Sequence, residues 1–158
     1  WITILKRRSG YIQAMDNLDP EKLASYTEKD INRLRSDNRI IRNSRKISAA
    51  VTNARAYLDL KNSGISFSSW LWDWVNGRPL INHYKSMSEV PAQTELSQRI
   101  SAELKKKGFS FVGPTIIYAY MQSAGLINDH LTDCYRHAEL ATESQALTIP
   151  GSTWSSPE

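Results

Sequence analysis

The 158-residue sequence predicts an all-α protein, and three observations support that prediction. Gly (7) and Pro (6) together make up about 8% of the chain, below the roughly 12% of average usage, which suggests few turns and long helices. In several segments apolar residues recur at intervals of three and four, the spacing of one helix face. No segment alternates apolar and polar residues convincingly, as a half-buried strand would.

The N-terminal helices can be placed from apolar spacing and from capping residues. Residues 1–15 place apolar side chains on one helix face and Lys, Arg and Ser on the other. Asp19 and Pro20 start a short second helix, with Asp as N-cap and Pro at the first helical position. Thr27, followed by Asp30 three residues later, is close to a capping box and opens a third helix.

The remaining elements follow from apolar patterning. Residues 44–61 repeat the helical spacing. Trp70 and Trp74 lie one helical turn apart, and we expect them to anchor the core. Residues 77–92 are expected to be irregular, whereas residues 114–124 are apolar nearly all round and predict a buried helix.

Length and composition restrict the class of protein. The length fits one domain, which we place at residues 1–137, and the Ser/Thr-rich residues 138–158 are expected to form a poorly ordered tail. Cys134 is the only cysteine, so an internal disulfide framework is excluded and a reducing compartment fits. No apolar run reaches the roughly 18 residues that a membrane helix needs, and no secretory segment opens the chain.

The charge is uneven along the chain. The formal net charge is +4, but the first 137 residues contain all 20 Lys and Arg and only 13 Asp and Glu, a net charge of +7. A basic body indicates a polyanionic partner. The alternative is an ordinary basic protein.

The most informative stretch is a predicted turn between two helices. Gly108 ends one helix, since glycine readily adopts a positive φ, and Gly113 precedes Pro114, which starts the next. The free N–H groups at that helix start suit a phosphate, and residues 105–107, all lysines, add long-range attraction. The alternative is an ordinary turn between two helices. We expect the hairpin to be pinned into the core by Phe109, Phe111 and Val112.

A second group of residues has metal-ligand character. His130 and Cys134, four residues apart, share one face of a helix and suit two corners of a tetrahedral zinc site, with His137 as a possible third ligand. The alternatives are a hydrogen-bonded His beside a buried Cys, or a nucleophilic Cys with His as base. Asp129 is a candidate carboxylate that could equally cap a helix or orient His130.

Five blocks of the sequence carry a family resemblance, namely residues 1–8, 40–43, 46–47, 53–57 and, above all, 108–130. They resemble the bacterial 3-methyladenine DNA glycosylase I family of the helix-hairpin-helix superfamily. The similarity runs from Trp1 to about Cys134, about 85% of the chain. After Tyr135 no counterpart is evident, and Arg136-His137 departs from the cysteine-rich ending of the family.

The resemblance implies a helix-hairpin-helix fold and hydrolysis of the N-glycosidic bond of 3-methyladenine in alkylated DNA, a base excision repair activity. It places Trp1 in the base pocket and implies a structural zinc held by His130 and Cys134 with two ligands from upstream of Trp1. The catalytic Glu also lies upstream of that Trp in the family. We therefore expect the fragment to lack its opening segment, to contain no catalytic residue and to be inactive. The family lacks a catalytic Asp after the hairpin, so Asp129 receives no such role.

The resemblance also implies a partner and a location. The partner is double-stranded alkylated DNA, and we expect a monomer in the bacterial cytoplasm, associated with the nucleoid and not with a membrane. Two alternatives are a non-catalytic helix-hairpin-helix module that binds DNA, and a zinc-stabilised helical interaction protein. The residues expected to contact DNA are Lys107, Gly108, Phe111, Gly113 and Thr115.

Overall fold

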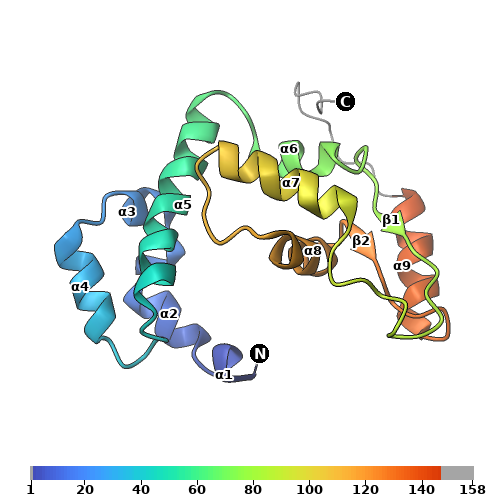
Figure 1. The fold of residues 1–158 in the computed structure, drawn as a ribbon, viewed down its shortest axis with the longest axis horizontal. Coiled ribbons are helices and arrows are strands. Elements are labelled where there is room, and N and C mark those ends of the chain that lie inside the picture. The colour runs from blue at the N-terminus through green and yellow to red at the C-terminus, as the bar shows by residue number, and fades with distance from the viewer. Residues whose placement is uncertain (1, 147–158) are drawn as a thin grey trace. The chain divides into compact units, whose positions relative to one another are not determined.

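The computed structural model describes residues 2–146, and helices build most of it, which confirms the predicted all-α class (Figure 1). Two compact units are present: unit 1 holds the described residues of Trp1–Ser63 and Lys105–Phe111, and unit 2 those of Gly64–Leu104 and Val112–Glu158. The domain expected over residues 1–137 therefore comprises two units. In chain order the elements are α1 (Ile2–Leu5), α2 (Arg8–Ala14), the 3-10 turn η1 (Asp16–Leu18), α3 (Pro20–Ala24), α4 (Glu28–Ser36), α5 (Ser44–Asn62), α6 (Phe67–Asp73), β1 (Leu80–Ile81), α7 (Glu95–Lys106), α8 (Pro114–Ser123), β2 (Ile127–Asn128) and α9 (Tyr135–Ala146).

The core of unit 1 forms around the long helix α5. Helices α3 and α4 pack on α5, and each contributes apolar side chains to one buried cluster (Figure 1). Removing this apolar surface from water is the main favourable contribution to folding of the unit. The cluster consists of Ala14, Met15, Leu23, Tyr26, Leu34, Ile40, Ile47, Val51 and Ala54.

The predicted helix starts in unit 1 are confirmed. The Asp19 carboxylate accepts from the backbone N–H groups of Glu21 (2.9 Å) and Lys22 (3.1 Å), and α3 begins at Pro20. The capping box opens α4, because the Asp30 carboxylate accepts from the backbone N–H of Thr27 at 3.0 Å. Such side chains satisfy N–H groups that the first turn of a helix leaves without an intrahelical acceptor.

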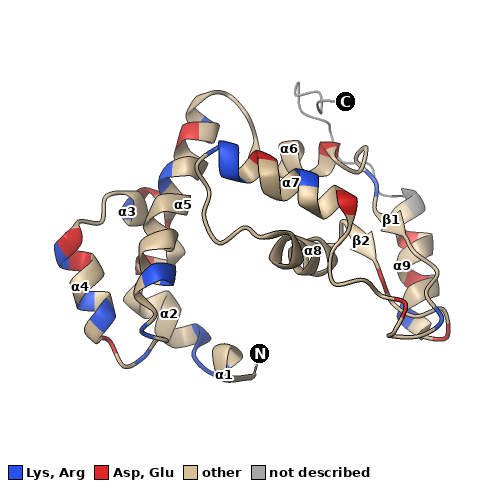
Figure 2. Cartoon of the chain, viewed as in Figure 1, with Lys and Arg blue, Asp and Glu red and all other residues tan. Residues whose placement is uncertain are grey.

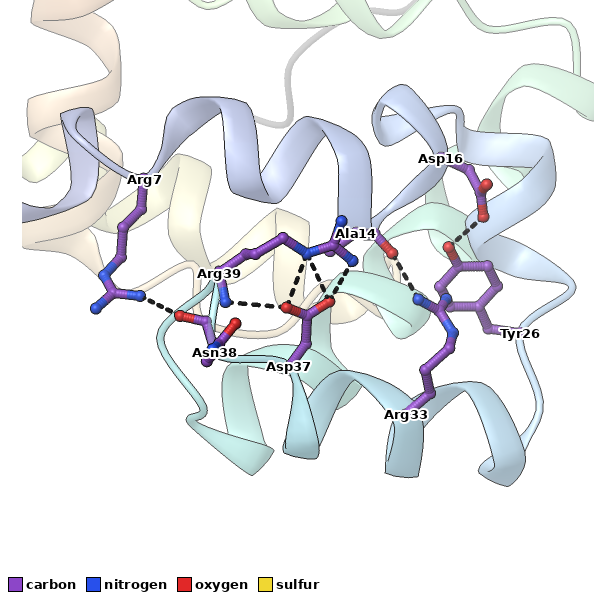
Figure 3. Close-up of polar contacts among 8 residues, drawn as sticks. All are labelled: Arg7, Ala14, Asp16, Tyr26, Arg33, Asp37, Asn38 and Arg39. Atoms are coloured by element: carbon purple, nitrogen blue, oxygen red, sulfur yellow. Dashed lines mark hydrogen bonds and ion pairs between the residues drawn. The ribbon is translucent and has the colours of Figure 1, made fainter.

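The helix predicted over residues 1–15 is interrupted. Helix α1 ends at Leu5, and α2 begins at Arg8. Between them Arg7 leaves helical geometry, and its Nη1 donates to the backbone carbonyl of Asn38 at 2.6 Å (Figure 3). Apolar spacing gives no sign of this break, because the bonding partner is far away in the sequence.

The loop between α4 and α5 approaches α2 closely at Gly10. A Cβ placed on Gly10 would lie 2.5 Å from the carbonyl oxygen of Arg39. The Arg39 guanidinium in turn binds the Asp37 carboxylate, with Nη2 to Oδ2 at 2.6 Å (Figure 3). This guanidinium holds the pKa of Asp37 at about 2, below its ordinary value of 3.8. Because the Arg39 carbonyl leaves no room for a Cβ, position 10 requires glycine.

Polar contacts also join α4 to α2, and the segment before α4 to η1. The Nη1 of Arg33 donates to the carbonyl of Ala14 at 3.0 Å, and the Tyr26 hydroxyl donates to the Asp16 carboxylate at 2.5 Å (Figure 3). Burial and the neighbouring Asp16 carboxylate raise the pKa of Tyr26. Arg33 therefore fixes the C-terminal end of α2 through a backbone carbonyl.

Unit 2 is built on tryptophan and on a short strand pair. Trp70 is fully buried and Trp74 nearly so, as expected, with their rings 6.0 Å apart in an edge-on arrangement. The segment expected to be irregular contains β1, which pairs in parallel with β2, Leu80 opposite Ile127. Two-residue strands are too short to produce an alternating pattern, so sequence periodicity could not reveal them.

Helix α8 is buried on one side only. Ile117, Tyr118 and Met121 are buried, but Ile116 is 54% exposed and Tyr120 42% exposed. The prediction of a helix buried all round is therefore wrong. Apolar composition sets an upper limit to burial, but neighbouring elements decide which face is covered.

The C-terminal region differs from the expected tail. Residues up to Ala146 form α9, and residues 147–158 lie outside the described part of the chain. The helix begins with an ion pair between Arg136 and Glu139 (2.6 Å) and continues through alanine, leucine and glutamate, which favour helices. Among residues 2–146, none of the helices combines the length and apolar character that a membrane span requires.

Candidate functional site

The predicted hairpin is present between α7 and α8, and we use "the hairpin" for residues 107–113. Gly108 has φ +87°, and its N–H donates to the carbonyl of Lys105 at 3.0 Å, which closes α7. Gly113 is the N-cap of α8, and no side chain caps this helix. Because Pro114 has no N–H, the amides of Thr115 and Ile116 are the N–H groups at the start of α8 without an intrahelical acceptor.

Gly113 has neither a backbone nor a packing reason to be glycine. Its φ is −62°, which any residue can adopt, and a Cβ placed on it would meet nothing within 4 Å in the described structure. Glycine therefore leaves open space in front of the α8 amides. This geometry allows another chain to approach the amides closely.

The hairpin is held to α5 by an asparagine that the sequence analysis gave no role. Asn53 Oδ1 accepts from the backbone N–H of Ser110 at 2.8 Å, and Asn53 Nδ2 donates to the carbonyl of Ser110 at 3.0 Å. The side-chain amide thus acts as a backbone partner for one residue of the hairpin. Asn53 lies in residues 53–57, a block that carries the family resemblance, and this was the one feature of the sequence that could have pointed to its role.

The apolar residues of the hairpin behave differently from one another. Val112 is buried, and its carbonyl accepts from the buried Ser101 hydroxyl at 2.6 Å. Phe111 is 45% exposed with φ +57°, so the expectation that it pins the hairpin into the core is wrong. A positive φ turns its side chain away from the direction that an ordinary extended residue would take. The hairpin therefore presents an aromatic side chain to solvent.

Charge is distributed unequally between the two units. Unit 1 contains 16 Lys and Arg and 7 Asp and Glu, a net charge of +9, whereas unit 2 contains 4 and 9, a net charge of −5. Figure 2 shows basic residues in the second half of α4, along α5 and in the last turn of α7. The basic segment 105–107 therefore belongs to the unit that already carries the positive charge.

His130 and Cys134 come together without a helix. Residues 129–134 form an extended segment and a turn, so the expectation that they share a helix face is wrong. The Thr132 N–H donates to the carbonyl of Tyr84 (2.9 Å), a partner that a helix would not use. Even so, the Cys134 Sγ lies 3.7 Å from the His130 Nδ1. Two ligands bound to one tetrahedral zinc at about 2.0 and 2.3 Å lie roughly 3.5 Å apart, so the pair fits half of such a site.

His137, considered as a third ligand, makes other contacts. Its Nε2 lies 2.8 Å from the carbonyl of Asn82, and its ring lies 5.1 Å from that of His83. Within residues 2–146, no group of three or more His, Cys, Asp or Glu side chains is placed to hold a metal ion. The described chain therefore supplies a pair of donors.

Both carboxylate oxygens of Asp129 accept hydrogen bonds. It receives bonds from Asn82 Nδ2 (2.6 Å), the Tyr118 hydroxyl (2.5 Å) and Gln122 Nε2 (2.7 Å). Burial and this carboxylate raise the pKa of Tyr118 well above its ordinary value. These contacts join α8 to the segments next to β1 and β2. These contacts give Asp129 a structural role in unit 2, and its lack of a catalytic role stays a prediction.

A cavity of about 480 Å³ in unit 2 lies beside these residues, and Trp72, Asp129 and His130 are among its lining. Trp1, the expected base-pocket residue, lies outside the described residues. The pocket role of Trp1 therefore remains a prediction.

Comparison with known proteins identifies the family. A family model described as methyladenine glycosylase matches residues 1–137. The chain belongs to the methyladenine glycosylase family. The DNA-3-methyladenine glycosylase of Haemophilus influenzae and DNA-3-methyladenine glycosylase 1 of Escherichia coli are each 44% identical to it over 134 residues. The match covers 85% of this chain and 72% of each relative.

Solved structures of methyladenine glycosylases share the fold. The crystal structure of a 3-methyladenine DNA glycosylase I matches with a TM-score of 0.83 and 42% identity, over 85% of this chain and 74% of that chain. The 3-methyladenine DNA glycosylase I of Staphylococcus aureus matches with a TM-score of 0.81 and 36% identity, over 85% and 72%. The resemblance inferred from the sequence is therefore confirmed.

Proposed function

We propose that this chain belongs to a DNA repair enzyme that hydrolyses the N-glycosidic bond of 3-methyladenine in alkylated DNA. The observation that carries the proposal is the match to methyladenine glycosylases over residues 1–137. Both curated relatives are DNA-3-methyladenine glycosylases, and one structural neighbour, with a TM-score of 0.81, is a 3-methyladenine DNA glycosylase I in complex with 3-methyladenine. The reaction class is hydrolysis of an N-glycosyl bond.

The chemistry of the substrate explains how such an enzyme works with little acid catalysis. A 3-methylated adenine in DNA is cationic, so it is already a good leaving group. The enzyme must take the base out of the stack and stabilise an oxocarbenium-like sugar while water attacks the anomeric carbon. In our proposal Trp1 stacks on the cationic base, a contact worth up to about 2 kcal/mol when desolvated.

In our proposal the hairpin binds the backbone of double-stranded DNA, as a helix-hairpin-helix motif. The uncapped amides at the start of α8 and the open space at Gly113 support this role. Amides that bind phosphate carry no sequence information, which suits an enzyme that searches for lesions. The residues proposed to contact DNA are Lys107, Gly108, Phe111, Gly113 and Thr115.

We also propose a structural zinc that uses His130 and Cys134 as two of its four ligands. The 3.7 Å separation of their donor atoms supports this assignment. A zinc here would tie the segment after β2 to the start of α9 and stabilise the C-terminal part of unit 2. Elemental analysis of the full-length protein should find about one zinc per monomer, the usual content of a single four-ligand site, and Cys134→Ser should lose it.

The activity is tested with the full-length, zinc-loaded protein and DNA treated with a methylating agent. Free 3-methyladenine should appear in the supernatant. If the protein binds duplex DNA but releases no methylated purine, the chain is a DNA-binding module and the proposed activity is wrong. Gly113→Arg should cut DNA affinity without changing the zinc content, because the added side chain blocks the approach to the α8 amides.

A further inference from the structure

We propose that a shallow groove between α5 and the hairpin binds a phosphate of the DNA backbone, as a contact additional to the α8 amides. The groove has a volume of about 420 Å³. The inference rests on the proposed function in one respect, namely that DNA is the partner. We call this surface the α5 groove, and it is lined by Arg35, Ser44, Arg45, Ser48, Ala49, Thr52, Ser110 and Phe111.

Hydroxyl groups form one wall of the α5 groove. Ser44, Ser48 and Thr52 follow one another at intervals of four residues, so they lie on one face of α5. Thr52 Oγ1 donates to the carbonyl of Ser48 at 3.2 Å, so its proton is already used. Within the described residues, the Ser44 and Ser48 hydroxyls make no hydrogen bond with protein atoms and are available as donors. An anion such as a phosphate can accept hydrogen bonds from these hydroxyls.

Two arginines give the groove its charge. Arg35 Nη1 is held by Glu28 Oε1 (3.1 Å) and Asn32 Oδ1 (2.9 Å), so this guanidinium is fixed in place and partly neutralised. Arg45 is exposed and has no ion pair in the described structure, so it is the main cation of the groove. A guanidinium and hydroxyl donors are the groups that usually contact DNA phosphates.

The other wall of the groove is the hairpin itself. Asn53 fixes Ser110 on α5, and Phe111 follows with an exposed ring. The groove is therefore continuous with the segment proposed to bind DNA. A backbone that reaches the hairpin would meet the serines and Arg45 of α5 next.

The shape and charge of the surroundings favour DNA over a small anion. The α5 groove is shallow and open, whereas a site for a free phosphate needs donors that enclose it. It also lies in the unit with a net charge of +9, which attracts an extended polyanion. An acidic peptide or a free phosphate would be a different occupant, and both are included in the test.

The test compares the affinities of variants for an undamaged DNA duplex of mixed sequence at several salt concentrations. Loss of one phosphate contact in Arg45→Gln should make the slope of log affinity against log salt shallower by about 0.9 and weaken binding about threefold to tenfold at low salt. Ser48→Asp should weaken binding more than Ser48→Ala, because the carboxylate repels a phosphate. Arg78→Gln, an exposed arginine in unit 2, is the matched control and should change neither quantity.

The outcomes separate this inference from the proposed function. A wild-type salt slope in Arg45→Gln, with equal affinities for Ser48→Asp and Ser48→Ala, overturns the α5 groove even if 3-methyladenine is released. The predicted losses support the groove even if no base is released. Inorganic phosphate or an acidic peptide that binds the chain without competition from duplex DNA, and is lost in Arg45→Gln, also overturns it. Circular dichroism of each variant excludes unfolding as the cause.

Discussion

Units 1 and 2 are both helical, but they use polar side chains in opposite ways. In unit 1, arginines fix the fold through backbone carbonyls: Arg55 bonds the carbonyls of Ala24 and Tyr26, as Arg33 bonds that of Ala14. In unit 2, a buried tryptophan and the acceptor Asp129 organise the interior. The net charge of +9 on unit 1 therefore does more than attract a polyanionic partner. Part of it holds unit 1 together, and only cations without such bonds, such as Arg45, are available to a ligand.

The largest expected effect concerns packing in unit 2. Trp70 is fully buried, so Trp70→Ala should lower the free energy of unfolding by about 3–5 kcal/mol through lost burial and a residual cavity. Urea unfolding followed by circular dichroism measures this. Met87→Ala, at a side chain that is 73% exposed, is the control and should change stability by less than about 0.5 kcal/mol. Equal effects of the two variants would contradict the view that unit 2 depends on its tryptophan core.

The next effect concerns the close approach inside unit 1. In Gly10→Ala the new Cβ would lie 2.5 Å from the carbonyl oxygen of Arg39, so α2 and the following loop must separate, at a cost of about 1–3 kcal/mol. Gly113→Ala is the matched control, since its Cβ meets nothing within 4 Å. Thermal unfolding should therefore distinguish the two substitutions. In a DNA-binding titration the larger loss should instead occur in Gly113→Ala, which should bind DNA more weakly than Gly10→Ala.

A smaller effect concerns the contact that holds the hairpin to α5. Asn53→Ala removes three hydrogen bonds with Ser110, two of them with its backbone, which should cost about 1–2 kcal/mol of stability and loosen the hairpin. Hydrogen exchange should then accelerate at the Ser110 amide, and DNA affinity should fall. Asn62→Ala, at the exposed end of α5, is the control for both readouts. An unchanged Ser110 exchange rate would show that Asn53 does not hold the hairpin.

The features that the sequence predicted correctly depend on neighbours along the chain. The capping residues Asp19 and Thr27, the helical turn between Trp70 and Trp74, and the glycines that bound the hairpin all act within a few residues. Such interactions leave a local pattern that can be read directly.

The features that it missed depend on contacts between distant residues. The break before α2 involves Asn38, and the hairpin contact joins Asn53 to Ser110 across 57 positions. The exposure of Phe111 goes with a positive φ at that residue. Phenylalanine rarely adopts a positive φ, so the residue type gave no sign of it. The His130–Cys134 pair was identified from its spacing, but its geometry comes from a turn bonded to Tyr84. A second unit was not expected, because each half of the chain has ordinary helical periodicity.

The smallest predicted effect tests whether arginine–carboxylate contacts stabilise unit 1. The Arg39 guanidinium holds the pKa of Asp37 at about 2 against 3.8 ordinarily, so ionised Asp37 favours the folded state. This contribution is present above pH 3.8 and is lost as the pH falls toward 2. Asp37→Asn should therefore be slightly less stable than the wild type at neutral pH, and the difference should shrink through that window. Urea midpoints measured along a pH series test this, and Arg39→Gln should give the same profile, with no further loss in the double variant. If the stability difference between Asp37→Asn and the wild type stays constant down to pH 2, the effect comes from packing and not from the ion pair. In that case the Arg39–Asp37 contact does not distinguish unit 1 from unit 2.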